Sequence, residues 1–217
     1  MTVVHLVRHG EVYNPDHVLY GRLPGFQLSL RGRQQAESVA RFLAPRPIAH
    51  LVCSPLERAQ QTAALLAAGL DLEPVIDQRL IEAANAFEGK QVAGGRGLAR
   101  DVAGWRHFRN PVRPSWGEPY EQIAERMLGA VFAAADVVGG LAPTASGQSP
   151  EAVCVSHQLP IYTVRRFVEG LRLFHDPRKR ECGLASVTTL TLVDHVVVGV
   201  TYAEPAGPTP AGAVAGA

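Results

Sequence analysis

The chain has 217 residues, 47% of them hydrophobic, and its 21 Lys and Arg nearly balance its 20 Asp and Glu, for a formal net charge of +1. So small a net charge argues against nucleic acid as a partner, because binding to a phosphate backbone needs a large positive excess. No apolar run approaches the ~18 residues of a membrane span, and the first residues lack the pattern of a signal peptide. We therefore expect a cytoplasmic protein with no membrane partner.

The chain contains three cysteines, Cys53, Cys154 and Cys182. Their odd number and wide spacing exclude a disulfide framework or a zinc ribbon as the basis of the fold. Cys53 and Cys154 lie within apolar runs, where a buried free thiol is the expected state.

Short β-branched runs alternate with segments of helical periodicity along the first 80 residues. In chain order we predict a strand at 3–7, a polar loop, a helix at about 30–43, a strand at 50–53, a helix up to about residue 68 and a strand at 75–76. Ser29 is the expected N-cap of the first helix. Ser54-Pro55-Leu56-Glu57 has the pattern of a capping box with proline at the first helical position, and should open the second helix.

The second half of the chain begins with an irregular, cap-like excursion at 83–117, in which we expect one short helix near 98–108. Beyond it we predict a helix at 120–138, a linker at 139–150, a strand at 152–156, a helix at 160–168 and a hairpin-like strand pair at 185–193 and 196–202. This order predicts a single α/β domain over 1–204, a three-layer α/β/α sandwich with a mostly parallel mixed sheet. The Ala-, Gly- and Pro-rich residues 205–217 should form a disordered tail.

Three of the predicted strands end in polar residues that are suited to binding an anion. Arg8 and His9 follow the first strand, Arg58 lies one helical turn beyond the second, and Ser156 and His157 follow a later one. If these strands are parallel neighbours, their carboxyl ends meet at one edge of the sheet, where ligands bind in such folds. Two imidazoles and two guanidiniums would then form an anion site, reinforced by backbone N–H groups at helix starts.

These residues belong to an ordered series of motifs that resembles the histidine phosphatase superfamily, also called phosphoglycerate mutase-like. The series comprises Leu6-Val7-Arg8-His9-Gly10-Glu11-x-x-Asn14, Gly21-Arg22, Leu28-Ser29-x-x-Gly32-x-x-Gln35-Ala36, Ser54-Pro55-Leu56-x-Arg58-Ala59-x-Gln61-Thr62-Ala63, Leu80-x-Glu82, Phe87-Glu88-Gly89 and Val155-Ser156-His157. A lone Arg-His-Gly triplet would be weak evidence, but the matches come in the family's order and span roughly residues 3–160.

The resemblance implies a role for each matching residue. His9 would attack phosphorus and form a phosphohistidine, while Arg8, Arg58 and His157 would hold the phosphoryl oxygens and Asn14 would add a hydrogen bond. These roles fit elementary chemistry, because guanidiniums disfavour a charged imidazole and stabilise the charge on a phosphoryl group in transfer. No metal or other cofactor is implied, and we find no clustered Asp and His ligand set.

The resemblance also implies a carboxylic acid that protonates the leaving oxygen and then takes a proton from water. Glu82 matches that position, but its distance from Phe87-Glu88-Gly89 is one residue shorter than in the family, so Glu88 is a competing candidate. Gln158 stands where the family usually has glycine; its backbone N–H can still bind phosphate, and its side chain could narrow the pocket. Glu118-Pro119 replaces the family's Glu-Ser, and we interpret it as a helix start without a catalytic role.

Five arginines gather in the irregular segment with three large aromatic residues: Arg96, Arg100, Arg106, Arg109, Arg113, Trp105, Phe108 and Trp116. They could form a cap that favours acidic or aromatic phosphoesters, but we favour a solvated basic face over packed aromatics. The six histidines outside the motifs are expected to be structural or exposed: His5, His17, His50, His107, His175 and His195.

Taken together, the sequence predicts a metal-independent phosphatase that hydrolyses a small phosphomonoester through His9. A phosphoglycerate mutase using the same site is the first alternative, although residues 80–84 lack the Glu-Arg-His sequence and the chain lacks the longer insertion of the mutases. A non-catalytic phosphate-binding module is a second. The final strand pair would leave an edge through which a homodimer could form.

Overall fold

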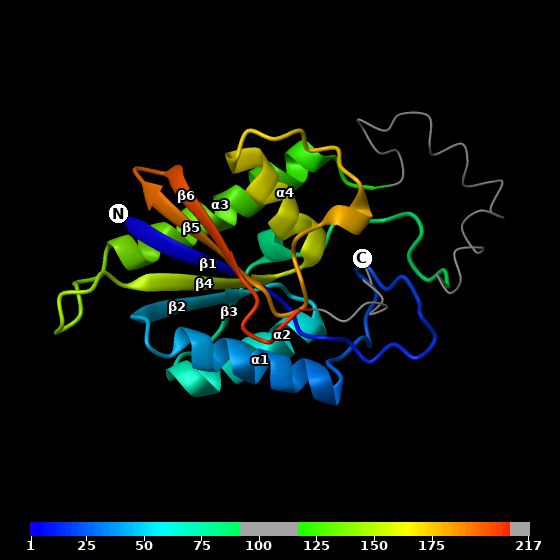
Figure 1. Ribbon diagram of the computed structural model, residues 1–217, viewed down its shortest axis with the longest axis horizontal. Helices are drawn as coiled ribbons and strands as arrows, with labels where there is room; N and C mark the ends of the chain where they lie inside the picture. Colours follow the sequence, from blue (N-terminus) through cyan, green and yellow to red (C-terminus); the bar gives the residue numbers. More distant parts are fainter. Residues whose placement is uncertain (92–116, 209–217) are drawn as a thin grey trace.

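The structure of the protein is a computed structural model that describes residues 1–91 and 117–208. One six-stranded sheet crosses the molecule in the order β3-β2-β4-β1-β5-β6 (Figure 1). The strands are β1 (Thr2–Arg8), β2 (Ile48–Cys53), β3 (Val75–Ile76), β4 (Glu151–Ser156), β5 (Val187–Val193) and β6 (Val196–Ala203). This mixed sheet confirms the predicted fold class, and each predicted strand is present.

The parallel part of the sheet brings together the three strand ends that carry the polar motifs. Strands β1 and β2 both pair in parallel with β4, and β3 pairs in parallel with β2. The antiparallel pair β5 and β6 extends the sheet from the other side of β1. As a result, β1, β4 and β2 are consecutive neighbours, and their carboxyl ends meet at one edge, as the sequence predicts.

Two pairs of helices cover the two faces of the sheet (Figure 1). Helices α1 (Leu30–Leu43) and α2 (Glu57–Leu70) lie on one face, and α3 (Tyr120–Gly139) and α4 (Gln158–Val168) lie on the other. The described residues also form two short 3-10 helices, η1 (Gln78–Leu80) and η4 (Pro177–Lys179). Each face has its own apolar cluster; every large side chain buried there contributes roughly 1.5–3 kcal/mol to folding.

The predicted start of the second helix is wrong, whereas the Ser29 cap of α1 is confirmed, since its side chain accepts from the N–H of Gly32. Helix α2 begins at Glu57, and Leu56 rather than Ser54 is its N-cap, without a side-chain hydrogen bond. The cause is that the N–H of Ser54 still bonds the carbonyl of Val155, so the chain has not yet left the sheet at this residue.

Five further predictions either differ in extent from the structure or cannot be compared with it. Helix α4 begins at Gln158, two residues before the predicted start, and β5 begins at Val187 because Ala185 has a φ of 55° that interrupts the strand. The predicted helix at 98–108, the aromatic and arginine cluster around it and residues 209–217 of the tail lie outside the described residues.

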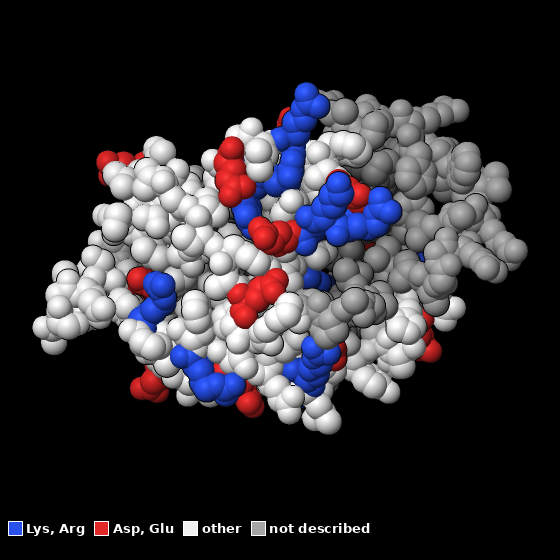
Figure 2. All heavy atoms as spheres, viewed as in Figure 1, with Lys and Arg blue, Asp and Glu red and all other residues white. Residues whose placement is uncertain are grey.

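The charge distribution on the surface and the length of the helices can also be compared with the expectations from composition. On the face seen in Figure 2, basic and acidic side chains are interspersed and form no continuous basic area. Within 1–91 and 117–208, no helix is both long and apolar enough to cross a membrane.

Candidate active site

His9, the predicted nucleophile, directly follows β1 at the carboxyl edge of the sheet. Its ring is buried, and its Nδ1 lies 2.8 Å from the carbonyl oxygen of Gly10. Because a carbonyl can only accept, Nδ1 carries the proton of the neutral ring and Nε2 keeps its lone pair. The close approach of another backbone segment requires glycine at position 10, since an added Cβ would lie 2.3 Å from the carbonyl oxygen of Gly32. The local backbone therefore fixes the His9 ring in the form that carries its lone pair on Nε2.

Two buried arginines flank His9. Arg58, in the first turn of α2, donates from Nε to Nε2 of His9 at 3.3 Å and from a terminal nitrogen to the carbonyl of Gly21 at 2.6 Å. Arg8, the last residue of β1, donates to the carbonyl of Cys182 at 2.7 Å. The Nε of Arg8 is buried without a partner in the described part of the chain. A buried donor without an acceptor is costly, which favours a bound anion here.

His157 follows β4 and is the N-cap residue of α4. Its ring centroid lies 5.1 Å from that of His9, and its Nε2 lies 2.7 Å from the hydroxyl of Ser54. The Nδ1 of His157 is buried and has no partner among the described residues. Sequence reasoning assigned Ser54 to a helix cap, so this contact was missed; it orients the second histidine of the site.

The surroundings of both histidines favour their neutral forms. Burial, followed by the charges of Arg58 and Arg8, lowers the pKa of His9 well below its usual value. Burial, followed by Arg58 and then His9, has the same effect on the pKa of His157. A neutral imidazole with a lone pair on one ring nitrogen is the form that can attack phosphorus.

Glu82 follows η1 and is 2% exposed. Its Oε1 accepts from the N–H of Ala83 at 2.8 Å, and its Oε2 is buried with no partner in the described residues. Burial raises the pKa of the Glu82 carboxyl, and this exceeds the opposite influences of the Ala83 N–H and of Arg58. The carboxyl can therefore hold a proton on Oε2, the oxygen that no backbone donor occupies.

Glu88, the competing candidate for the acid, accepts hydrogen bonds from two backbone N–H groups. Its Oε1 accepts from the N–H of Arg22 at 3.1 Å and from the N–H of Asn85 at 3.3 Å. These bonds join two loops and use the carboxylate as an acceptor. The geometry thus favours Glu82 over Glu88 as the proton donor.

Two arginines that share one carboxylate hold the segment carrying Glu82. Arg22 donates from Nε to the Glu82 carbonyl at 2.7 Å, and Arg126 donates to the carbonyl of Ile81 at 2.7 Å. Both also bind Glu118, at 2.9 Å from Arg22 and 2.6 Å from Arg126. Glu118 precedes the first turn of α3, as predicted, but its link to the acid segment was not visible in the sequence.

Two other predicted phosphate ligands have partners of their own. The side chain of Asn14 donates to the carbonyl of Val18 at 2.9 Å and accepts from its N–H at 3.0 Å. Gln158 is the first residue of α4, and its side chain donates to the carbonyl of Cys182 at 3.3 Å. In the described part of the chain, no hydrogen bond joins Asn14 to the histidines or arginines of the cluster, and one of the two amide N–H groups of Gln158 is occupied by Cys182.

Two residues near the site had no signal in the sequence. The ring of Tyr20 lies 4.7 Å from the guanidinium carbon of Arg58 and meets the His9 ring edge-on at 6.5 Å between centroids. Arg180, between α4 and β5, influences the pKa of Glu82. Neither residue lies in a recognisable motif, and only the folded chain brings them to the cluster.

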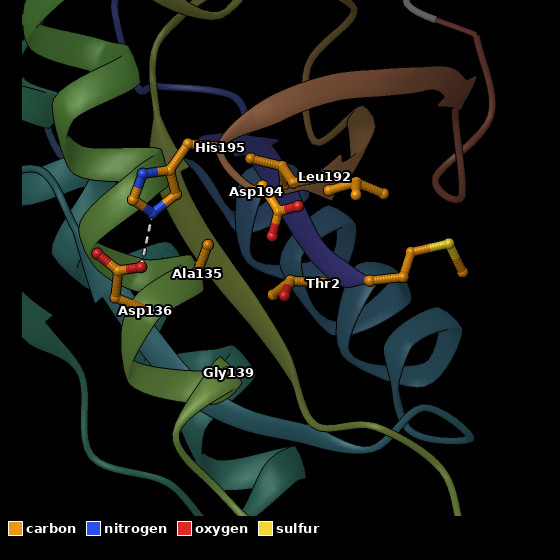
Figure 3. Close-up of a pocket in the computed structure, with 9 residues that line it drawn as sticks. Thr2, Ala135, Asp136, Gly139, Leu192, Asp194 and His195 are labelled. Atoms are coloured by element: carbon orange, nitrogen blue, oxygen red, sulfur yellow. Dashed lines mark hydrogen bonds and ion pairs between the residues drawn. The ribbon is translucent and has the colours of Figure 1, made fainter.

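The opposite end of the sheet holds a surface cavity of about 480 Å³ without comparable chemistry (Figure 3). It lies beside Thr2 at the start of β1, about 20 Å from Arg8 at the usual rise per residue of a strand. His195 bonds Asp136 at its rim, at 2.6 Å. Within the described ranges, no group of three or more His, Cys, Asp or Glu side chains is arranged to hold a metal ion.

Buried cations, two neutral histidines and a carboxyl with a raised pKa together define a site for handling phosphoryl groups. The family model of the histidine phosphatase superfamily (branch 1) matches residues 4–204, so the chain belongs to this family. The family includes phosphatases and mutases, and the protein is a phosphoryl-handling enzyme of the phosphoglycerate mutase-like fold.

Individual relatives agree with this assignment. The chain is 52% identical over 205 residues to the uncharacterized protein Rv0525 of Mycobacterium tuberculosis, covering 94% of this chain and 97% of that protein. It is 29% identical over 194 residues to the probable phosphoglycerate mutase GpmB of Cronobacter sakazakii, covering 86% and 85%. Among solved structures, mycobacterial glucosyl-3-phosphoglycerate phosphatase Rv2419c with VO3 aligns with a TM-score of 0.73 and 25% identity, covering 93% and 97%.

Proposed function

We propose that the protein is a metal-independent phosphatase that hydrolyses a phosphomonoester through a phosphohistidine on His9. The observation that carries the proposal is a set of buried polar atoms that have no partner among residues 1–91 and 117–208: Arg8 Nε, His157 Nδ1 and Glu82 Oε2. Buried polar groups are normally satisfied. A phosphoryl group would supply acceptors to the first two, and its leaving oxygen would accept a proton from the third.

In the first step, Nε2 of His9 attacks phosphorus and the bond from phosphorus to the ester oxygen breaks. Glu82 gives its proton to that oxygen, so the product leaves as an alcohol. Arg8, Arg58 and His157 stabilise the charge on the phosphoryl oxygens, with the first N–H groups of α4 adding donors. Asn14 completes this set if substrate draws its side chain away from Val18.

In the second step, water attacks the phosphohistidine. The Glu82 carboxylate takes a proton from that water, inorganic phosphate forms, and the bond from phosphorus to Nε2 breaks. His9 and Glu82 return to their starting forms. The buried location of Glu82 suits both transfers, because its raised pKa lies closer to the operating pH.

Release of phosphate from an aryl phosphate tests this proposal. We expect steady release that is unaffected by a chelator and lost in His9→Ala. Failure of the well-folded protein to hydrolyse any member of a broad phosphoester panel contradicts the hydrolytic assignment.

A mutase is the second candidate, supported by the 29% identity to a probable phosphoglycerate mutase. It would return the phosphoryl group of His9 to a second substrate oxygen instead of water. Incubation with 3-phosphoglycerate separates the two: faster formation of the 2-isomer than of free phosphate favours the mutase, and the reverse favours the phosphatase.

A further inference from the structure

Ser54 and His157 follow two neighbouring strands, and the backbone fixes both. Strands β2 and β4 pair in parallel, with Cys53 opposite Val155. The N–H of Ser54 donates to the carbonyl of Val155 at 2.9 Å, and the carbonyl of His157 accepts from the N–H of Ile161 at 3.2 Å as α4 begins. Both side chains are fully buried. The 2.7 Å distance between the Ser54 hydroxyl and Nε2 of His157 is therefore set by the sheet.

The direction of this hydrogen bond follows from the donors and acceptors that are present. A hydroxyl donates once and can accept twice. The Ser54 oxygen already accepts from the N–H of Leu56 at 3.3 Å, and within residues 1–91 and 117–208 its O–H meets one acceptor, Nε2 of His157. If Nε2 carried a proton, the buried O–H would have no acceptor, which is costly. Ser54 therefore donates, and Nε2 holds a lone pair.

The proton of the His157 ring must then be on Nδ1. Burial, followed by the charges of Arg58 and His9, lowers the pKa of His157, so the ring is neutral and has a single N–H. Nδ1 is buried and has no partner in the part of the chain that the structure describes. A buried N–H in this state needs an acceptor.

His9 has the same tautomer but presents the opposite nitrogen. Its Nδ1–H donates to the carbonyl of Gly10 at 2.8 Å, which leaves the lone pair on Nε2. In His157 the lone pair of Nε2 is taken by Ser54, which leaves Nδ1–H. The two ring centroids lie 5.1 Å apart. Two neighbouring histidines can thus supply an electron pair and a hydrogen-bond donor.

We propose that Ser54 is a positioning residue that fixes His157 in its Nδ1–H tautomer, so that this N–H donates to a phosphoryl oxygen. The donation rests on the proposed function, whereas the tautomer does not. Ionised phosphoryl oxygens can only accept, so the other tautomer would face them with a lone pair. Because Ser54 selects the competent tautomer before phosphate arrives, binding does not have to select it.

Nitrogen NMR of the isotope-labelled protein measures the tautomer directly. Two-bond proton–nitrogen correlations distinguish the ring nitrogen that carries the proton, and His157→Gln identifies the signals. We expect Nδ1–H in the wild type, loss of this single tautomer in Ser54→Ala, and its return in Ser54→Thr, which keeps the hydroxyl. The matched control is Thr163→Val, which removes a buried hydroxyl of α4 that has no partner among the described residues and should leave the tautomer unchanged.

Phosphate binding shows whether the tautomer matters to the site. Calorimetry with inorganic phosphate should give a Kd about fivefold higher in Ser54→Ala than in the wild type. Ser54→Thr and Thr163→Val should stay near the wild-type value. In Ser54→Ala, kcat/KM should fall by similar factors on an alkyl phosphate and on a nitrophenyl phosphate, because both carry the same phosphoryl group. Loss of the acid Glu82 should instead depend on the leaving group.

An Nε2–H tautomer in the wild type would overturn the proposal. So would a Ser54→Ala protein that keeps the wild-type tautomer or the wild-type affinity for phosphate. If Ser54→Ala fails to fold, as judged by thermal unfolding, Ser54→Cys replaces it, because a thiol is a much weaker donor. A tautomer and a phosphate affinity that depend on Ser54, without phosphate release from any ester, would contradict the proposed function while supporting the role of Ser54.

Discussion

The two ends of the central sheet treat buried polar groups in opposite ways. On the amino side, the side chain of His5 extends from the middle of β1 to Glu151 at the start of β4. His5 is fully buried, but its ring nitrogens lie 2.8 Å from the Thr189 hydroxyl and 2.7 Å from Glu151, which also binds Arg46. At the carboxyl end, Arg8, Glu82 and His157 each keep a buried atom without a partner in the described residues. A satisfied network stabilises the fold, whereas unsatisfied groups cost stability and are retained where a ligand completes them.

The largest effect should come from His9. Replacing it with alanine removes the proposed nucleophile, and phosphate release should fall roughly 1,000-fold or more. The loss is large because catalytic residues that act together lose most of their effect when one of them is removed. Steady-state kinetics with an aryl phosphate measure this. His5→Ala is the matched control at the other end of the sheet, and its folded fraction should keep the kcat of the wild type. Comparable activity in His9→Ala and wild type would show that the carboxyl end of the sheet is not the catalytic end.

The two candidate acids should differ next most strongly. Glu82→Gln cannot protonate a leaving oxygen, and kcat on an alkyl phosphate should fall about 100-fold or more, with a smaller loss on a nitrophenyl phosphate. Glu88→Gln keeps an acceptor for the N–H groups of Arg22 and Asn85, so its effect should be minor. Equal losses in both variants would show that the acid lies elsewhere.

Substitution of His5, in contrast, should change the free energy of unfolding. His5→Ala deprives Glu151 and Thr189 of their buried partner and should lower the free energy of unfolding by about 2–3 kcal/mol. Urea unfolding checks this value. His195→Ala removes an exposed histidine-carboxylate pair and should cost under about 0.5 kcal/mol. If both substitutions were neutral, the His5 network would not be the stabilising feature that its bonds indicate.

The smallest expected effect is the contribution of Glu82 to the pH dependence of the free energy of unfolding. Burial raises its pKa in the folded state, so the unfolded chain loses this proton first and stability falls as pH rises through the folded pKa. Glu82→Gln removes that titration and should become more stable than the wild type as pH increases from 4 to 8. Urea unfolding at both pH values tests the sign; a difference that does not change with pH would mean that Glu82 is not held as a neutral acid.

The parts that the sequence could predict are those with local signals. Periodicity located the strands and helices, and the carboxyl ends of parallel strands bring Arg8, His9 and His157 together without knowledge of any contact. Individual side-chain contacts were not predictable in this way. Ser54 had the pattern of a helix cap, but its N–H bonds the carbonyl of Val155 and its hydroxyl bonds His157.

Other site residues depend on contacts between distant segments. Glu118 is 36 positions from Glu82 in sequence, and only the two arginines that it binds connect them. Arg180 lies in a stretch without periodicity, and its orientation comes from His175 and two tyrosines. The choice between Glu82 and Glu88 likewise required burial and bonding, because both are carboxylates within one loop.

The central claim is that the carboxyl end of the sheet transfers phosphoryl groups through His9. Its most direct test is a rapid alkaline quench of the protein during turnover of a radiolabelled phosphomonoester, followed by mass spectrometry of the labelled peptides. We predict up to one phosphoryl group per chain, stable in alkali, labile in acid and located on His9. Phosphate release with no labelled protein, or with the label on another residue, would contradict the account.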